Sequence, residues 1–183
     1  DLVLGPVLLQ PAPTGGYDFE AHTSFAPGQG QEMAHRGASL RIEHDLSPAW
    51  LLKGISAWRT LDTESFIDID ASALELGDVF VGLDQSQLSH ELQLQYDNGS
   101  TLQAVFGAYY LREDLASYQE AYADDFIRFI GAPVAFLRTI SDDLETTSTA
   151  VFAHASWEFA PTWTVSGGVR WSEDEKHYDR TTS

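Results

Sequence analysis

The sequence predicts an all-β protein, in which antiparallel strands joined as hairpins form part of a large transmembrane β-barrel. Three observations predict this fold class. Long segments alternate apolar and polar side chains with a period of two, which is typical of strands with two different faces. The expected strands are long, and each expected hairpin has a tight turn at one end and a long connection at the other, as in outer-membrane barrels.

The clearest hairpin spans residues 88–111. Apolar and polar residues alternate from Leu88 to Tyr96, and Asp97-Asn98-Gly99-Ser100 supplies side chains that tolerate positive φ in a turn. A second run rich in aromatic and branched residues then returns from Leu102 to Leu111. Each arm is about ten residues long, whereas strands of soluble sheets have about five or six and strands that cross a bilayer about nine to eleven.

Two more hairpins and three long connections complete the prediction. The hairpins span residues 38–60 and 148–172, with turns that contain Pro48 and Pro161. The connections are rich in Pro, Gly or acidic residues and cover residues 1–37, 61–87 and 112–147.

Smaller elements are expected inside these connections. A short strand is expected near Tyr17–Phe25, and the charged run Glu173–Lys176 begins a further connection. Ser117 with Glu120 resembles a capping box and predicts a helix that ends near Gly131. Aromatic residues recur every four positions in this helix: Tyr118, Tyr122 and Phe126.

The strand register can be predicted from the apolar pattern. If the outer hairpins turn through three residues and the central one through five, apolar residues face each other. The expected pairs are Ile42 with Gly54, Leu94 with Ala104, Trp157 with Val165, and Ala153 with Val169.

In this register large residues recur eight positions apart on the apolar face. The pairs are Trp50 and Trp58, Leu102 and Tyr110, and Trp163 and Trp171. Eight residues span about 26 Å, or about 20 Å of height in a tilted strand, which is close to the roughly 25 Å apolar band between the aromatic girdles of outer-membrane barrels. The alternative is that these residues simply favour strands and cores.

The opposite face carries polar and charged side chains of both signs. They are Arg41, Glu43, Asp45, Lys53, Arg59, Glu91, Gln93, Gln95, Glu158 and Arg170. This composition suits a water-filled or plugged lumen, but the same face would point to solvent in a soluble barrel. The period of the pattern leaves both possibilities open.

Composition narrows the function classes. The chain of 183 residues has a formal charge of −18, which argues against binding to nucleic acid phosphates. No stretch approaches the roughly 18–20 apolar residues of a membrane helix, so a membrane role requires a barrel. The absence of cysteine excludes disulfides and thiolate metal sites. Because the chain starts at Asp1 and stops after a charged run, we expect a fragment of a larger barrel.

Three blocks resemble the barrel of a TonB-dependent outer-membrane receptor of the iron-complex type. They read GASLRIEHDLSPAWLLKGISAWRTLDTES, DQSQLSHELQLQYDNGSTLQAVFGAYYLREDL and TAVFAHASWEFAPTWTVSGGVRWSEDEK. The resemblance implies that residues 1–183 are part of one barrel domain of about 22 strands, in the outer membrane of a Gram-negative bacterium. It further implies uptake of a ferric siderophore or similar nutrient, energised by TonB through a plug domain that is absent here.

Candidate ligand-binding residues follow from this resemblance, because aromatic faces and fixed cations suit an anionic ferric chelate. They are Tyr109, Arg112, Tyr118, Tyr122, Arg128 and Arg170. The alternative is that the tyrosines pack a loop helix against the barrel. With so acidic a chain, a preference for an anionic ligand cannot be inferred from charge.

No catalytic, cofactor or metal site is expected. The acidic pairs Asp124-Asp125 and Asp142-Asp143 lack the regular spacing of a calcium loop, and we interpret them as parts of solvated or cation-bridged extracellular loops. The six histidines never pair at ligand spacing within one element.

Two other functions remain open. One is a passive porin-like channel, which would have no plug. The other is a secreted, soluble β-sheet module that binds carbohydrate by stacking on exposed tryptophans. An enzyme is a distant third hypothesis, because the carboxylates lie in loops and the sequence shows no catalytic partner placed beside them.

Overall fold

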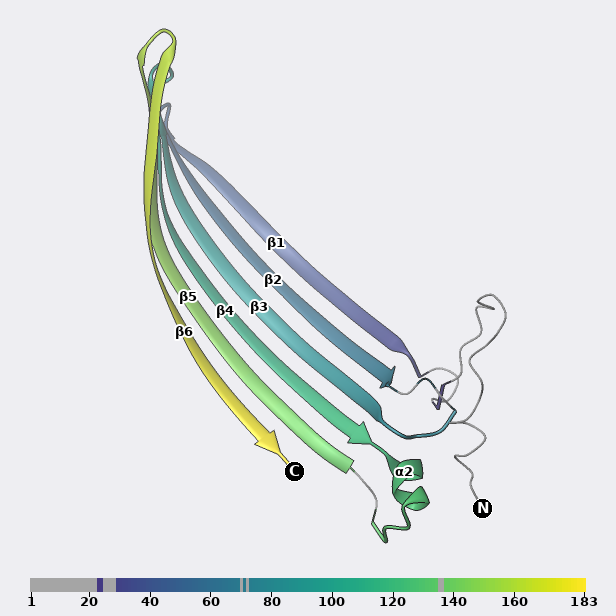
Figure 1. Cartoon of the computed structure of the whole chain (residues 1–183). Coiled ribbons are helices and arrows are strands. Elements are labelled where there is room, and N and C mark those ends of the chain that lie inside the picture. The colour runs from purple at the N-terminus through teal and green to yellow at the C-terminus, as the bar shows by residue number, and fades with distance from the viewer. Residues whose placement is uncertain (1–22, 25–28, 70, 72, 135–136) are drawn as a thin grey trace, which may run out of the picture.

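The structure, a computed structural model, describes residues 23–24, 29–69, 71, 73–134 and 137–183. In these residues one antiparallel sheet holds six strands in sequence order, with a short helix between the fourth and the fifth (Figure 1). The elements are β1 (Gln31–Ser47), β2 (Trp50–Asp68), β3 (Asp78–Asp97), β4 (Leu102–Tyr122), α2 (Asp124–Phe129), β5 (Leu137–Ala160) and β6 (Trp163–Thr182).

The sheet is curved and open, and it forms a wall rather than a closed body (Figure 1). β1 and β6 are its two edges, and the three hairpin turns gather at the end opposite to α2. Among the described residues Ala150 is the one hydrophobic residue that is buried, at 3% exposure, so the sheet has no conventional core. No helix in the described part of the chain has the length and apolarity needed to span a bilayer.

The strands are much longer than the sequence predicts. β3 and β4 have 20 and 21 residues and pair over their whole length, from Asp97↔Gln103 to Asp78↔Tyr122. The expected connections 61–87 and 112–147 are therefore wrong in extent, because most of each is strand. Likewise the run Glu173–Lys176 lies inside β6. The expected strand near Tyr17–Phe25 lies almost wholly outside the described residues.

The predicted helix is wrong at its start. Ser117 and Tyr118 belong to β4 and pair with both β3 and β5, so a sheet ladder satisfies the backbone that a capping box would have served. The helix is α2 (Asp124–Phe129), which begins after Ala123 without a side-chain cap. Gly131, with φ of +70°, lies just after its end as expected.

Away from the turns the register is confirmed for the two outer hairpins, whereas next to each of these turns it shifts by one residue at a bulge, at Ser47↔Trp50 and at Ala160↔Trp163. Ile42 faces Gly54, Trp157 faces Val165, and Ala153 faces Val169. The central prediction is wrong by two residues, since Leu94 pairs with Phe106 and Ala104 with Tyr96. A slip of two residues leaves every side chain on its predicted face, because the side-chain period is also two.

The central turn explains the shift. The Oδ1 atom of Asn98 accepts hydrogen bonds from the backbone nitrogens of Ser100, Thr101 and Leu102 at 3.0, 2.9 and 3.0 Å. Gly99 has φ of +71°, a conformation that glycine adopts without a steric penalty. One side chain thus organises a five-residue turn that begins at Asn98, one residue later than expected.

The turns step progressively along the sheet, which indicates tilted strands. Ala49 in the first turn accepts a hydrogen bond from the Asp97 nitrogen at 2.9 Å, level with the end of β3. Thr101 in the second turn accepts one from the Glu158 nitrogen at 2.8 Å, and β5 continues past that point to Ala160. Each turn therefore reaches further along the sheet than the one before it. Turns staggered in this way come to one height when the strands are inclined to the barrel axis.

Candidate functional site: a wall with two faces

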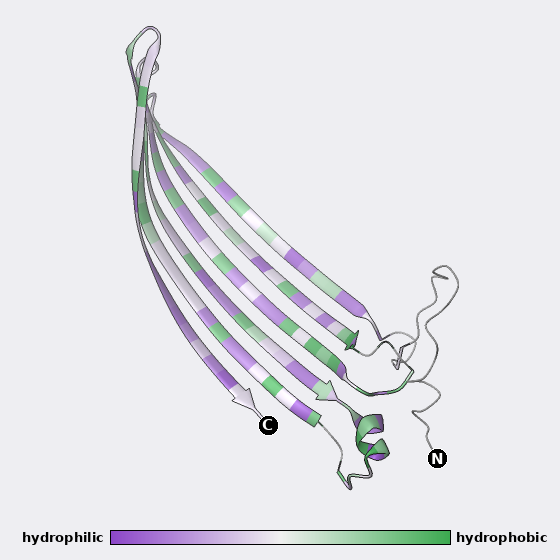
Figure 2. Ribbon diagram, viewed as in Figure 1, coloured by the Kyte–Doolittle hydropathy of each residue, from purple (hydrophilic) through white to green (hydrophobic). Residues whose placement is uncertain are grey.

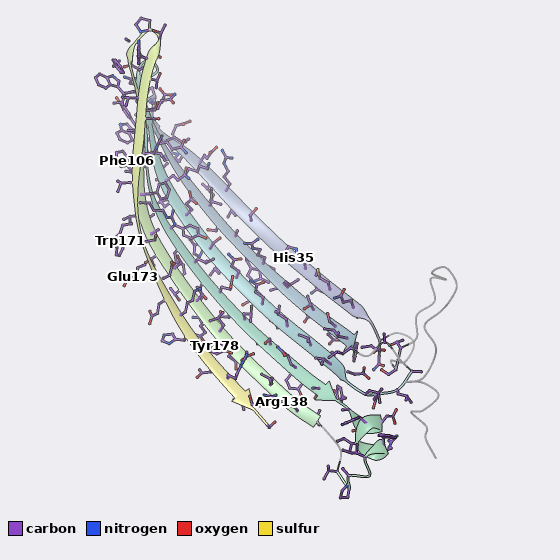
Figure 3. The ribbon with its side chains drawn as sticks, viewed as in Figure 1. His35, Phe106, Arg138, Trp171, Glu173 and Tyr178 are labelled. Atoms are coloured by element: carbon purple, nitrogen blue, oxygen red, sulfur yellow. The ribbon has the colours of Figure 1, made fainter. Side chains whose placement is uncertain are left out.

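The outer face of the wall is an apolar band at the turn end of every strand. On β3 and β4 the outward residues from Leu88 to Tyr96 and from Leu102 to Tyr110 include no Asp, Glu, Lys or Arg. Leu92, Phe106 and Val169 are 54%, 47% and 70% exposed, although they are large and apolar. Figure 3 shows Phe106 and Trp171 along the convex side of the sheet. This band is the surface that lipid would cover.

Aromatic residues border the band on both sides. At the turn end the ring centroids of Trp50 and Tyr96 are 4.7 Å apart, and Phe159 lies 5.8 Å from Trp157 and 6.3 Å from Trp163. At the other border the ring of His90 stacks on Tyr110 at 6.4 Å. Amphipathic rings are favoured at the two interfaces of a bilayer, and the two borders of the band have this composition.

The inner face within the same rows is polar. Arg41 pairs with Glu43, and Gln93 bridges Glu91 to Gln95 through amide hydrogen bonds. Near the turns this face forms a hollow of about 660 Å³. Its inward-facing lining includes Asp45, Gln93, Gln95, Gln103 and His154. Figure 2 shows how hydrophilic and hydrophobic residues alternate along each strand to give the wall its two faces.

One arginine of the inner face rests on aromatic rings instead of a carboxylate. The guanidinium carbon of Arg170 lies 5.8 Å from the ring centroids of both Tyr109 and Phe152. The Phe152 ring covers Gly107 of the neighbouring strand, where an added Cβ would come within 2.1 Å of it. Within the described residues no carboxylate lies within salt-bridge distance of Arg170. The two rings therefore hold this cation on the inner face.

Away from the turns, beyond the aromatic border, one carboxylate of the inner face is strongly held. Asp142 accepts hydrogen bonds from Nε and Nη2 of Arg180 at 2.6 and 2.9 Å and from the Tyr178 hydroxyl at 2.6 Å. The hydrogen bonds from Arg180, and then from Tyr178, lower the pKa of Asp142 from 3.8 to about 2. The Arg180 guanidinium also lies 5.7 Å from the Tyr178 ring centroid. Sequence reasoning missed this cluster, because its members lie 36 and 38 positions apart.

Two hydrogen bonds join the connection before β3 to α2 at the loop end. The nitrogen of Glu75 donates to Oδ2 of Asp125 at 3.2 Å, and the nitrogen of Asp125 donates to the Glu75 carbonyl at 3.1 Å. Desolvation and the nearby carboxylates of Asp124, Asp78 and Asp125 raise the pKa of Glu75. Among the described residues no group of three or more His, Cys, Asp or Glu is placed to hold a metal ion.

Comparison with known proteins identifies the wall. The family model described as "TonB dependent receptor-like, beta-barrel" matches residues 5–183. The chain belongs to this family. A solved structure with the same fold is the ferric yersiniabactin uptake receptor FyuA from Yersinia pestis, with a TM-score of 0.70 and 16% sequence identity. The match covers 84% of this chain and 22% of that one. No curated protein matches the chain.

In a TonB-dependent receptor barrel, the polar face lines the lumen and the apolar band faces lipid. The chain spans about a fifth of the length of the receptor that it resembles. A segment of this length supplies only part of a closed sheet, which accounts for the open edges of β1 and β6. The family is one of receptors and not of enzymes.

The structure does not bring the six candidate ligand residues together. Tyr109 and Arg170 share the inner face and touch. Arg112 and Tyr118 lie on the outer face, where Arg112 pairs with Asp114 at 3.0 Å and Tyr118 donates to Glu120. The other two lie at the loop end: Tyr122 ends β4, and Arg128 of α2 pairs with Asp125 at 3.0 Å.

We expect Gly107→Ala to displace the Phe152 ring and so to loosen Arg170. The added methyl group would overlap the ring, and overpacking of this kind costs about 1–3 kcal/mol. Urea unfolding of the full-length receptor measures the loss. Gly54→Ala is the matched control, because nothing lies within 4 Å of its new Cβ. Equal stability of the two variants would contradict this account of Phe152.

The Asp142 cluster should be insensitive to pH until strong acid. A carboxyl whose pKa is lowered on folding stabilises the fold above its unfolded pKa and loses that effect as pH falls through the folded pKa, here about 2. The difference in urea midpoint between wild type and Asp142→Asn should therefore be constant from pH 7 to about pH 4 and shrink toward pH 2. A difference that already vanishes at pH 5 would show that Arg180 does not hold Asp142.

Proposed function

We propose that the chain is the wall segment of an outer-membrane receptor that takes up a ferric siderophore or a similar scarce nutrient with energy from TonB. The observation that carries the proposal is the two-faced wall. A charge-free outer band between aromatic borders suits lipid, and the inner face in the same rows is charged and hydrogen-bonded. The family membership and the likeness to FyuA support the same function.

On this proposal residues 1–183 all belong to one barrel domain in the outer membrane of a Gram-negative bacterium, and a plug domain elsewhere in the protein engages TonB. The inner wall supplies ligand contacts, and Tyr109 with Arg170 is the candidate pair on that wall. No chemical change of the ligand is required of any residue. A soluble carbohydrate-binding module does not fit an exposed apolar band that spans all strands.

Uptake of ⁵⁵Fe chelates by cells tests this function. We expect accumulation that depends on the intact gene, on TonB and on the proton-motive force. The control is a strain that expresses the receptor but lacks TonB. Uptake that persists in the control strain would indicate the passive porin-like channel, and no gene-dependent iron uptake with any chelate would contradict the proposal.

A further inference from the structure

A line of aspartates crosses the outer face of the wall in its loop half. Asp62 is directly paired with Asp84, and Asp143 is directly paired with Asp179. Ala116 lies between the two pairs, because it is paired with both Asp84 and Asp143. Even-numbered residues of β3 face outward, as in the apolar band, so the line belongs to the outer face. We call these four carboxylates the aspartate row.

The aspartate row has no counter-charge among the described residues. Arg112, on the same face, serves the neighbouring acids Asp114 at 3.0 Å and Glu145 at 3.9 Å. Within the part of the chain that the structure describes, no basic side chain lies within salt-bridge distance of the row, and its four carboxylates are exposed. Like charges directly opposite each other on neighbouring strands destabilise a sheet. A bound cation would remove this repulsion.

The centre of the row is a hollow that combines small, aromatic and acidic side chains. Its volume is about 370 Å³, within the range of about 300–1,000 Å³ that small-molecule pockets have. An added Cβ at Gly82 would lie 3.6 Å from Cε1 of Phe80, so the Phe80 ring lies beside this glycine. Phe66 packs on Phe80 with 4.8 Å between the ring centroids. The lining includes Asp62, Phe80, Gly82, Asp84, Ala116, Tyr118 and Asp143.

This geometry suits an extended organic cation better than a metal ion. Asp84 and Asp143 lie two strands apart, which is about 10 Å at the usual strand spacing. Among the described residues no group of three or more His, Cys, Asp or Glu is placed to hold a metal ion. A linear polyamine has ammonium groups separated by methylene chains, so its charges can reach both aspartate pairs at once. Ammonium groups are also attracted to the faces of aromatic rings.

We propose that the hollow in the aspartate row binds a linear polyamine on the outer surface of the barrel. Its ammonium groups pair with Asp62 and Asp84 on one side and with Asp143 and Asp179 on the other. Its methylene chain crosses Ala116 beside the aromatic rings. The site lies on the face opposite to the lumen, so the inference goes beyond the proposed function and does not depend on it.

Equilibrium dialysis of radiolabelled spermidine against the full-length receptor in a non-ionic detergent tests the proposal. Mg²⁺ is present throughout, because a compact dication screens the acidic surface without bridging the two aspartate pairs. Wild type should still bind spermidine saturably. Asp84→Asn and Asp143→Asn should each weaken binding about fivefold, the effect of losing one exposed ion pair. Ala116→Lys should abolish binding, because its own ammonium group would occupy the centre of the row.

Matched controls separate the row from net charge and from folding. Glu113→Gln removes the same charge from the inner face of β4 and should leave the affinity unchanged. Butylamine has a single ammonium group and should not displace spermidine at equal concentration. The Asn variants remove a repulsion, so their urea midpoints should not fall below that of wild type. Spermidine should raise the midpoint of wild type but not that of Ala116→Lys.

Loss of all saturable spermidine binding in Mg²⁺ would overturn the proposal, because the row would then be only a charged surface. Wild-type affinity in Ala116→Lys and in both Asn variants would overturn it too, as would an equal loss in Glu113→Gln or displacement by butylamine. Each of these results would leave TonB-dependent iron uptake, and with it the proposed function, unaffected.

Discussion

Replacement of Leu92 by arginine is expected to destabilise the folded receptor by about 2–4 kcal/mol, the cost of a basic side chain on the lipid face at the bilayer midplane. Leu92 lies four residues from both Leu88 and Tyr96, at the centre of the apolar band, and is 54% exposed. In a soluble sheet a change at such an exposed position would cost little. The large expected effect therefore depends on lipid and not on contacts within the protein.

The measurement is equilibrium unfolding of the full-length receptor in lipid vesicles. Gln93→Arg is the matched control, since the next residue of β3 points to the inner face, where both signs of charge already occur. We expect this variant to stay within about 0.5 kcal/mol of wild type, as surface changes usually do. Equal destabilisation by the two substitutions would contradict the assignment of the two faces.

The second large effect is expected at the central turn. Asn98→Ala removes one acceptor that serves three backbone nitrogens, at 2.9–3.0 Å. With a net contribution of about 0.5–1.5 kcal/mol for each hydrogen bond, and with water able to reach the turn, we expect a loss of about 2 kcal/mol. Asn98→Asp keeps the acceptor oxygen and should lose much less.

A disulfide test reports the register that this turn sets. Cysteines introduced by Leu94→Cys and Phe106→Cys should cross-link readily, because these residues are directly paired. Leu94→Cys with Ala104→Cys should not. If the second pair cross-links while Asn98 is in place, the result would support the register predicted from the sequence and contradict the observed one.

Much of the turn half of the sheet, which carries the apolar band, follows from the sequence. Apolar surroundings on one face and water on the other impose strict alternation of side chains there. The faces of Trp50, Trp58, Trp163 and Trp171 and two of the three hairpin registers were all predictable for this reason. The register of the central hairpin was not, because the hydrogen bonds of Asn98 that decide it depend on backbone geometry that no pattern displays.

The loop half was mistaken for connections because its alternation has a different chemistry. Past Trp171 the outward residues of β6 are Glu173, Glu175, His177 and Asp179, and the inward ones include Lys176 and Arg180. With polar residues on both faces, the period-two hydrophobic signal disappears although the ladder continues. The Asp142 cluster was missed for the same reason: its members come together only through the pairing of β5 with β6, and this pairing was not predicted.

The six candidate ligand residues show the limit of reasoning by residue type. Residue type alone proposes arginine and tyrosine as ligand contacts, but the choice between the two faces needs the register of each strand. Arg112 and Tyr118 point outward to carboxylates, whereas Arg170 and Arg180 point inward. Once strand boundaries are known, counting in twos from Tyr110 and Trp171 assigns all four residues.

The most direct test of the central claim is a spin-label scan along β3 of the full-length receptor in membranes, one label at a time from residue 84 to residue 96. From Leu88 to Tyr96 the even positions should be accessible to oxygen in the lipid and the odd positions to a water-soluble nickel chelate. The oxygen signal should end at Leu88, because Asp84 lies beyond the aromatic border. Accessibility without a period of two, or oxygen accessibility that continues to Asp84, would contradict a wall that faces lipid on one side and a lumen on the other.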